Sequence, residues 1–249
     1  AKFITVSNHF PFPEDEMNNT FALDTGDETV DGYFNTVHYA DEALAEFFQY
    51  MKDAGLYDNT IFVLYGDHFG ISSSRNETVA PLIGANADLW SAYDDTMMQR
   101  VPFIIHNPGS GTGQISDVYG GQIDILPTVM HLLGVDTSAY VQLGQDLLSA
   151  QNEGIVVFRN GSIVTSEYTI LGNTVYHTQT GTLAYQTEEV IQKVAEIRAQ
   201  AELQLAISDQ IINGDLLRFY TPDGFVPVDK SLHNYVDSPA ELEDDIAEL

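Results

Sequence analysis

The sequence predicts an α/β fold in which a mostly parallel sheet with flanking helices is followed by a small antiparallel sheet packed on a long helix. Strand-like runs at residues 3–6 and 61–65 flank an amphipathic helical pattern at 33–51, which makes a strand–helix–strand unit. Four short strand-like runs then occupy the second half of the chain. A second long helical pattern, at 187–213, supplies the surface on which these strands can pack.

The first half of the chain supplies the elements of the parallel sheet. The helical pattern at 33–51 ends before Gly55, a common stop signal. The run 61–65 is apolar without alternation, which is typical of a strand buried on both faces. Two such strands joined by a helix imply parallel pairing with a right-handed crossover. Residues 102–106 predict a third strand, and a further helix is expected to begin at Asp124.

The second half of the chain has the pattern of an antiparallel meander. Its strand-like runs are residues 155–158, 162–165, 168–171 and 174–177. Tight-turn dipeptides at 160–161 and 172–173 separate neighbouring runs, as hairpins require. We therefore expect residues 1–150 to form part of an α/β core, and residues 151–249 to add the small sheet, the helix at 187–213 and an acidic tail within the same domain.

Charge and composition exclude several classes of function. The chain of 249 residues carries 9 basic against 37 acidic side chains, a formal net charge of −28. Nucleic acids and anionic membrane surfaces are held by clustered Lys and Arg, so neither is an expected partner. The absence of cysteine excludes disulfides, zinc–thiolate sites and thiol nucleophiles. No apolar stretch reaches the roughly 18–20 residues that span a bilayer. The last nine residues hold five acids and are expected to fray.

The strongest local indication of chemistry is the sequence Gly66-Asp67-His68, directly after the predicted strand at 61–65. Ligands of open parallel sheets bind beyond the carboxyl ends of the strands, where this pair would lie. A carboxylate oxygen beside an imidazole nitrogen suits Mn²⁺ or Zn²⁺ and, with more oxygen ligands, Mg²⁺. The alternative is structural: Asp67 would cap a helix and His68 would be a hydrogen-bonded loop residue.

His9 is the second candidate, because it ends the predicted strand at 3–6 and so shares the same sheet edge. Its imidazole could bind a phosphoryl oxygen, donate a proton or ligate a metal, or it could simply shape a turn. Arg75 could clamp an anion or be a surface arginine. The remaining candidates are expected to be structural. They are His38, His131, His177 and Asp124.

Six segments carry a resemblance that covers nearly the whole chain except the acidic tail. They are VSNHFPF at 6–12, YFNTVHYAD at 33–41, LYGDHFGIS at 64–72, YGGQIDILPT at 119–128, VFRNG at 157–161 and NGDLLRFY at 213–220. In order and spacing they resemble the lipoteichoic acid synthase family, membrane-anchored phosphoglycerol transferases of the sulfatase and alkaline phosphatase superfamily. The segment at 119–128 is also similar to sulfatases at large.

The resemblance implies a role for each candidate in a sulfatase-like core. Asp67 and His68 would be ligands of a catalytic Mn²⁺, with Mg²⁺ or Zn²⁺ as alternatives, and His9 would bind the phosphoglycerol group. In the family, glycerol phosphate moves from phosphatidylglycerol to a growing polymer through a phosphorylated threonine. A metal could activate that hydroxyl and neutralise charge on the phosphoryl oxygens.

The chain also departs from the family pattern, since it has no match to the segments with the threonine, a glutamate metal ligand or the membrane helices. We therefore expect the C-terminal portion of an extracellular catalytic domain, with no catalytic nucleophile in this chain and no activity alone. Its partners would be the missing N-terminal half, phosphatidylglycerol and the polymer, at the outer face of the cell membrane. A sheet that lacks strands would expose an apolar edge and invite self-association.

Two other functions remain open at this point. A sulfatase-like or phosphodiesterase hydrolase would share the Asp67–His68 pair and the segment 119–128. A non-catalytic binding domain derived from such an enzyme would share the fold without the reaction. The segments at 6–12 and 213–220 favour the transferase over the hydrolase.

Overall fold

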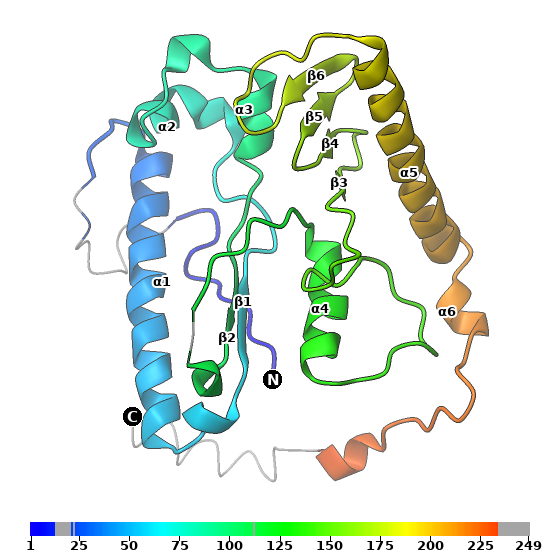
Figure 1. Ribbon diagram of the computed structural model, residues 1–249. Helices are drawn as coiled ribbons and strands as arrows, with labels where there is room; N and C mark the ends of the chain where they lie inside the picture. The colour runs from blue at the N-terminus through cyan, green and yellow to red at the C-terminus, as the bar shows by residue number, and fades with distance from the viewer. Residues whose placement is uncertain (13–20, 22, 112, 234–249) are drawn as a thin grey trace.

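Helix α1 (Glu28–Asp53) runs along one side of the computed structural model, which describes residues 1–12, 21, 23–111 and 113–233 (Figure 1). The helix predicted at 33–51 is confirmed, and it begins earlier than the apolar pattern indicated. Asp27 caps the helix, because its carboxylate accepts hydrogen bonds from the backbone amides of Thr29 and Val30 at 3.0 and 3.3 Å. Acidic side chains in the first turn add favourable interactions with the helix dipole.

The first sheet consists of β1 (Phe62–Tyr65) and β2 (Phe103–His106), so both of these predicted strands are confirmed. The two strands pair antiparallel, with Val63 opposite Ile105. The expectation of a mostly parallel sheet is therefore wrong for the strands that the structure describes. Only Phe62 of β1 is fully buried and Tyr65 is exposed, so β1 is also not covered on both faces as its apolar run suggested.

The parallel pairing fails because residues 3–6 form no strand. The carbonyl of Val6 accepts a bond from the amide of His9 in a local turn, and the ring of Phe3 packs edge-on against Phe47 of α1 at 6.0 Å. Strand β1 pairs with the next strand along the chain instead. Since the connection from β1 to β2 returns to the same end of the sheet, β2 must run in the opposite direction.

Shorter helices surround this sheet. The connection between its strands contains α2 (Asn76–Leu82) and α3 (Ala92–Met97), and α4 (Ile125–Leu132) follows β2. The helix expected from Asp124 is confirmed as α4, but α2 and α3 were not predicted. A capping box starts α3: the amide and hydroxyl of Ser91 donate to the carboxylate of Asp94 at 2.8 and 2.7 Å.

The predicted antiparallel meander is confirmed. Its strands are β3 (Val156–Val157), β4 (Ile163–Val164), β5 (Tyr168–Leu171) and β6 (Thr174–His177), paired in chain order. Helix α5 (Glu188–Asn213) packs on this sheet and is capped by Thr187, and the short α6 (Leu216–Phe219) follows (Figure 1). Sheet and helix share one apolar core. It contains Ile163, Tyr168, Ile170, Val175, Ala184, Val194, Ile197 and Ala201.

Truncation of Ile170 should weaken this core strongly, because the side chain is fully buried. Ile170→Ala is expected to lower the free energy of unfolding by about 2–5 kcal/mol through lost burial and a residual cavity. Ile191→Ala on α5, where the side chain is 52% exposed, should cost far less. Urea unfolding, monitored by circular dichroism, gives the free energy of unfolding of each variant. Equal losses would show that the sheet and α5 do not share a core.

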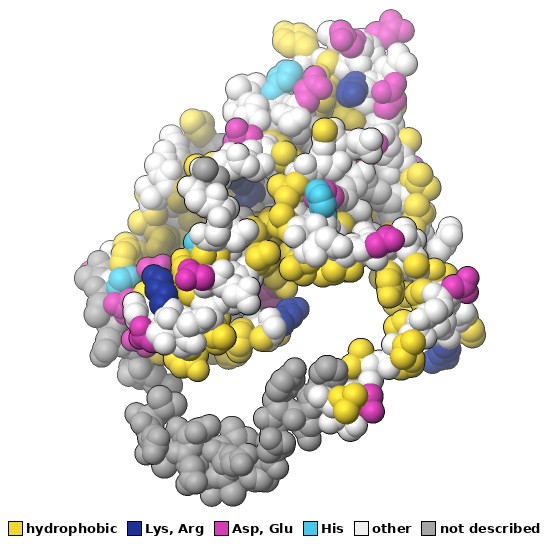
Figure 2. Space-filling view, turned by 60° about the horizontal axis from the view of Figure 1, so that its bottom comes forward, with side chains coloured by type: hydrophobic (Ala, Val, Ile, Leu, Met, Phe, Trp, Pro, Cys, Tyr) yellow, Lys and Arg dark blue, Asp and Glu magenta, His cyan; other side chains and the backbone are white. Residues whose placement is uncertain are grey.

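The surface combines many carboxylates with exposed apolar side chains. Figure 2 shows hydrophobic groups gathered on one face, with few Lys or Arg side chains among them. In the first half of the chain the exposed apolar residues include Phe3, Ile4 and Val6, at 73–76%, and Ile104 of β2, at 52%. No helix in the described ranges is long and apolar enough to cross a membrane. The acidic tail that was expected to fray lies outside the described residues.

Candidate functional site

The site begins at the end of β1, where the chain leaves the sheet at Gly66. A Cβ atom on this residue would lie 2.7 Å from the Cβ of Val101, so only glycine fits without a shift of the segment that enters β2. The amide of Gly66 donates to the carbonyl of Pro102 at 3.0 Å, which continues the pairing of β1 with the segment that enters β2. The position of the following loop is therefore fixed by the sheet.

Asp67 and His68 project from this loop toward each other. The Oδ1 atom of Asp67 lies 3.8 Å from the Nε2 atom of His68, and their side chains are 74% and 55% exposed. The Nδ1 atom of His68 lies 2.8 Å from the carbonyl oxygen of Phe69. A carbonyl can only accept, so Nδ1 carries a proton, and in the neutral form of the ring the free lone pair lies on Nε2. The pair thus offers one oxygen and one nitrogen donor to solvent.

His9 lies beside this pair. Its ring centre is 5.6 Å from that of His68, and the two rings are nearly perpendicular. Its Nδ1 atom lies 2.7 Å from the carbonyl of Phe10, the same arrangement as in His68, so the lone pair of the neutral ring again lies on Nε2. The expected proximity of His9 to the Asp67–His68 pair therefore occurs. The expected cause, a shared sheet edge, is wrong, because residues 3–6 are not a strand.

Two side chains that sequence reasoning missed contact this loop. Gln122 donates from Nε2 to the carbonyls of Gly66 and Asp67 at 3.3 and 2.8 Å. The ring of Tyr33, from α1, covers Gly70, where a Cβ atom would lie 2.2 Å from ring atom Cε2. Burial raises the pKa of the Tyr33 phenol above its ordinary value. Neither side chain has a local sequence pattern that indicates such a role.

Gln122 is itself held by Asp124, which is buried and structural as expected. The two carboxylate oxygens of Asp124 accept hydrogen bonds from the amides of Gly121 and Gln145 at 2.8 and 2.7 Å. Its backbone carbonyl accepts from the hydroxyl of Thr128 at 2.6 Å. Asp124 therefore fixes the short 3-10 turn Gln122–Asp124 that leads into α4.

Replacement of Asp124 should test this structural role. Asp124→Ala leaves two amides, those of Gly121 and Gln145, without their acceptor, at an expected cost of about 2–4 kcal/mol in unfolding free energy. Asp136→Ala removes an exposed carboxylate that bonds only its local turn and should cost well under half as much. Chemical denaturation measures the free energy of unfolding of both variants. A neutral Asp124→Ala variant would argue that this turn is not fixed by its carboxylate.

The other candidates have ordinary structural partners. Arg75 donates to the carboxylate of Asp27 at 2.8 Å and so ties the loop after β1 to the cap of α1. His38 lies 3.7 Å from Glu42 within α1, and the ring of His177 packs on that of Tyr168. These contacts agree with the structural roles expected for the histidines, and they engage Arg75 in an ion pair.

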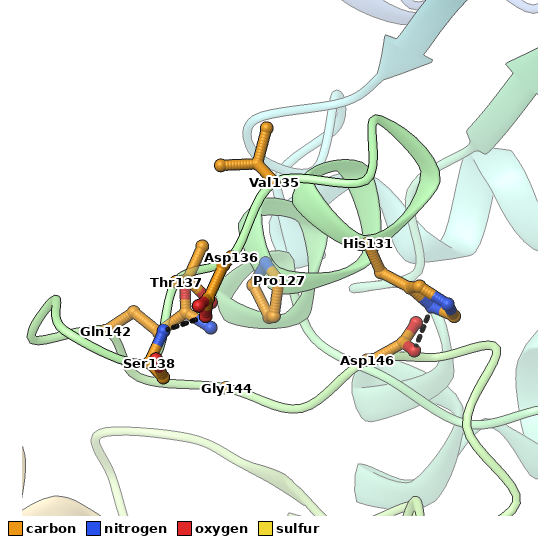
Figure 3. Close-up of a pocket in the computed structure, with 9 residues that line it drawn as sticks. All are labelled: Pro127, His131, Val135, Asp136, Thr137, Ser138, Gln142, Gly144 and Asp146. Atoms are coloured by element: carbon orange, nitrogen blue, oxygen red, sulfur yellow. Dashed lines mark hydrogen bonds and ion pairs between the residues drawn. The ribbon is translucent and has the colours of Figure 1, made fainter.

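A hollow of about 430 Å³ lies away from the Asp67–His68 pair, at the C-terminal end of α4 (Figure 3). His131 pairs there with Asp146 at 2.5 Å, on the opposite side of the hollow from Asp136, which bonds Ser138. The hydrogen bonds from Ser138 lower the pKa of Asp136, so this carboxylate stays ionised. Two carboxylates make the hollow unsuited to a phosphate ester.

The donors at the end of β1 fit part of a divalent metal site. Bonds of about 2.0–2.2 Å in tetrahedral geometry place neighbouring donor atoms about 3.4 Å apart, close to the observed 3.8 Å between Asp67 and His68. No group of three or more His, Cys, Asp or Glu side chains with metal-binding geometry occurs in the part of the chain that the structure describes. Two protein donors are too few for a stable catalytic site, so a metal held at this position would need further ligands.

Comparison with known families and proteins gives consistent results. The sulfatase family model matches residues 1–135. The chain is 44% identical over 236 residues to lipoteichoic acid synthase 2 of Bacillus subtilis, covering 94% of this chain and 35% of that protein. It is 38% identical over 240 residues to the lipoteichoic acid synthase of Staphylococcus aureus, covering 96% of this chain and 36% of that protein. The chain thus spans about a third of the length of these relatives.

Solved structures agree with the sequence relatives. The lipoteichoic acid synthase LtaP from Listeria monocytogenes superposes with a TM-score of 0.65 at 29% identity, over 82% of this chain and 52% of that chain. An alkaline phosphatase superfamily protein from Vibrio parahaemolyticus superposes with a TM-score of 0.54 at 22% identity, over 84% of this chain and 48% of that chain. The second match supports the fold alone. Both confirm the expected α/β class of the sulfatase and alkaline phosphatase type.

Proposed function

The chain belongs to the sulfatase family, and on that premise we propose that it is part of a metal-dependent phosphoglycerol transferase of lipoteichoic acid synthesis. The enzyme moves glycerol phosphate from phosphatidylglycerol to a growing polymer. One observation carries the proposal: Asp67, His68 and His9 converge at the end of β1 in a chain whose relatives are lipoteichoic acid synthases.

Asp67 and His68 are the proposed metal ligands of this chain. Their Oδ1 and free Nε2 atoms face the same space, and both side chains are open to solvent. The oxygen and imidazole donors suit Mn²⁺, with Mg²⁺ or Zn²⁺ as alternatives. When bound, the metal supplies Lewis-acid stabilisation for the phosphoryl oxygens and activates a hydroxyl nucleophile. Two ligands are an incomplete set, so this chain alone binds the ion weakly and is inactive.

His9 is the proposed substrate-binding residue. Its ring stands perpendicular to that of His68, and its Nε2 atom is not engaged by the backbone. A neutral Nε2 can accept a hydrogen bond from a glycerol hydroxyl, and a protonated ring can donate one to a phosphoryl oxygen. His9 therefore orients the phosphoglycerol group beside the metal ligands.

The nucleophile belongs to the part of the catalytic domain that this chain does not contain, and we assign it to a threonine that becomes phosphorylated during transfer. The remaining half of the domain would also supply further metal ligands and cover the apolar face that includes Phe3, Ile4 and Ile104. A parent enzyme anchored in the cell membrane, with this domain on its outer face, would meet both phosphatidylglycerol and the polymer.

A chimera tests this proposal directly. The aligned segment of the Bacillus subtilis relative is replaced by this chain, which matches it over 236 residues. We expect the purified chimera to release diacylglycerol from phosphatidylglycerol when Mn²⁺ is present and to lose this activity in EDTA. A folded chimera without turnover would contradict the transferase proposal. Glycerol phosphate released to water, with none transferred to an acceptor, would favour the hydrolase alternative.

A further inference from the structure

We infer that Gln122 is a positioning residue for the Asp67–His68 pair: its side-chain amide holds the backbone of the metal-binding loop in the geometry that lets both donors reach one ion. This inference rests on the proposed function, because it concerns the same site. Gln122 is 55 residues from Asp67 in the sequence, and no local pattern links the two.

The hydrogen bonds of Gln122 are directed at the ligand-bearing loop itself. One amide nitrogen, Nε2, donates to the carbonyl of Asp67 at 2.8 Å and to the carbonyl of Gly66 at 3.3 Å. These carbonyls belong to the residues at which the chain leaves β1. Rotation of the peptide between them would swing the side chain of Asp67 away from that of His68, and the two bonds to Gln122 oppose that rotation.

The backbone of Gln122 is held in a fixed position. Asp124, only 7% exposed, fixes the turn Gln122–Asp124 through the amides of Gly121 and Gln145. Gly120 lies so close to Leu147 that a Cβ atom would come within 2.4 Å of its side chain. Gln122 is itself exposed, but the turn that carries it is anchored by the buried Asp124, so its amide supports the loop from a fixed backbone position.

The binding of Mn²⁺ alone to this chain tests the inference without an activity assay. Paramagnetic Mn²⁺ broadens the NMR signals of nearby imidazole protons even when binding is weak. His131, which pairs with Asp146 in the separate hollow, serves as an internal reference for ions attracted by the net charge of −28. We expect the ring signals of His68 to broaden at lower Mn²⁺ concentrations than those of His131.

The variants separate positioning from stability. Gln122→Met keeps the length of the side chain but removes the donor, and it should raise the Mn²⁺ concentration that half-broadens His68 by about tenfold, with His131 unchanged. Gln179→Met is the matched control, because Gln179 also donates from its side-chain amide, to the Tyr119 hydroxyl at 3.1 Å and the Ser166 carbonyl at 3.4 Å, and neither acceptor belongs to the loop with Asp67 and His68. Thermal unfolding of both variants should differ little from that of the original chain.

Two results would overturn the inference, and they differ in what they say about the proposed function. Unchanged broadening of His68 in Gln122→Met, while His68 is still selectively broadened in the original chain, rejects the role of Gln122 and leaves the metal site in place. Broadening of His68 no stronger than that of His131 in the original chain rejects both the metal site and its support.

Discussion

His68→Ala in the active chimera is expected to reduce glycerol phosphate transfer by about 10³-fold or more. The substitution removes the Nε2 atom that lies 3.8 Å from Asp67, and so takes from the proposed metal site the nitrogen ligand that His68 would supply. Metal-ion stabilisation of transition-state charge amounts to several kcal/mol, and each 1.36 kcal/mol corresponds to a factor of ten in rate. Asp67→Ala should have an effect of similar size. The rate of diacylglycerol release from phosphatidylglycerol measures the activity of each variant.

His131→Ala is the matched control for this experiment. His131 also neighbours an aspartate, Asp146, and is comparably exposed, but it lies in the hollow at the end of α4. We expect transfer within about twofold of the unmodified chimera, because surface ion pairs contribute little even to stability. If His68→Ala kept more than a tenth of the activity, or if His131→Ala were as damaging, the Asp67–His68 pair would not be the metal site.

The elements predicted well were those specified by neighbouring residues. Helix α5 has a cap at Thr187 and a long apolar stripe, and the hairpins of the second sheet have Asn-Gly and Gly-Asn turns, so each could be located within a short window. Helix α3 carried a comparable local indication, the Ser91 and Asp94 capping box, which was overlooked. Local patterns of this kind determine secondary structure almost independently of the rest of the fold.

The errors arose where distant segments had to be paired. Residues 3–6 have the composition of a strand but make no ladder, and the antiparallel pairing of β1 with β2 depends on how the long connection between them folds. The supports of the candidate site are hidden from the sequence for the same reason. Gln122 and Tyr33 contact the loop after β1 from positions far away in the sequence. No sequence pattern predicts that a particular glutamine or tyrosine will make such a long-range contact.

Gly70→Ala is expected to have the second largest effect on transfer, a loss of about 10²-fold. The new Cβ atom would lie 2.2 Å from Cε2 of Tyr33, so either the ring or the loop must move. The ring cannot retreat freely, because it packs against Phe12 and Phe34 at centroid distances of 5.5 and 5.6 Å. The loop therefore yields, and misplacement of reacting groups by about 1 Å is enough for a loss of this size.

A second substitution should restore part of this loss if the clash with Tyr33 is its cause. Tyr33→Leu shortens the side chain above Gly70 while keeping an apolar contact for Phe12, so the double variant should transfer glycerol phosphate faster than Gly70→Ala alone. Gly113→Ala is the control, since a Cβ atom there meets nothing within 4 Å. If the activity losses of the two single variants simply added in the double variant, Tyr33 would not fix the position of this loop. Normal turnover of Gly70→Ala would show that transfer does not depend on the contact between Gly70 and Tyr33.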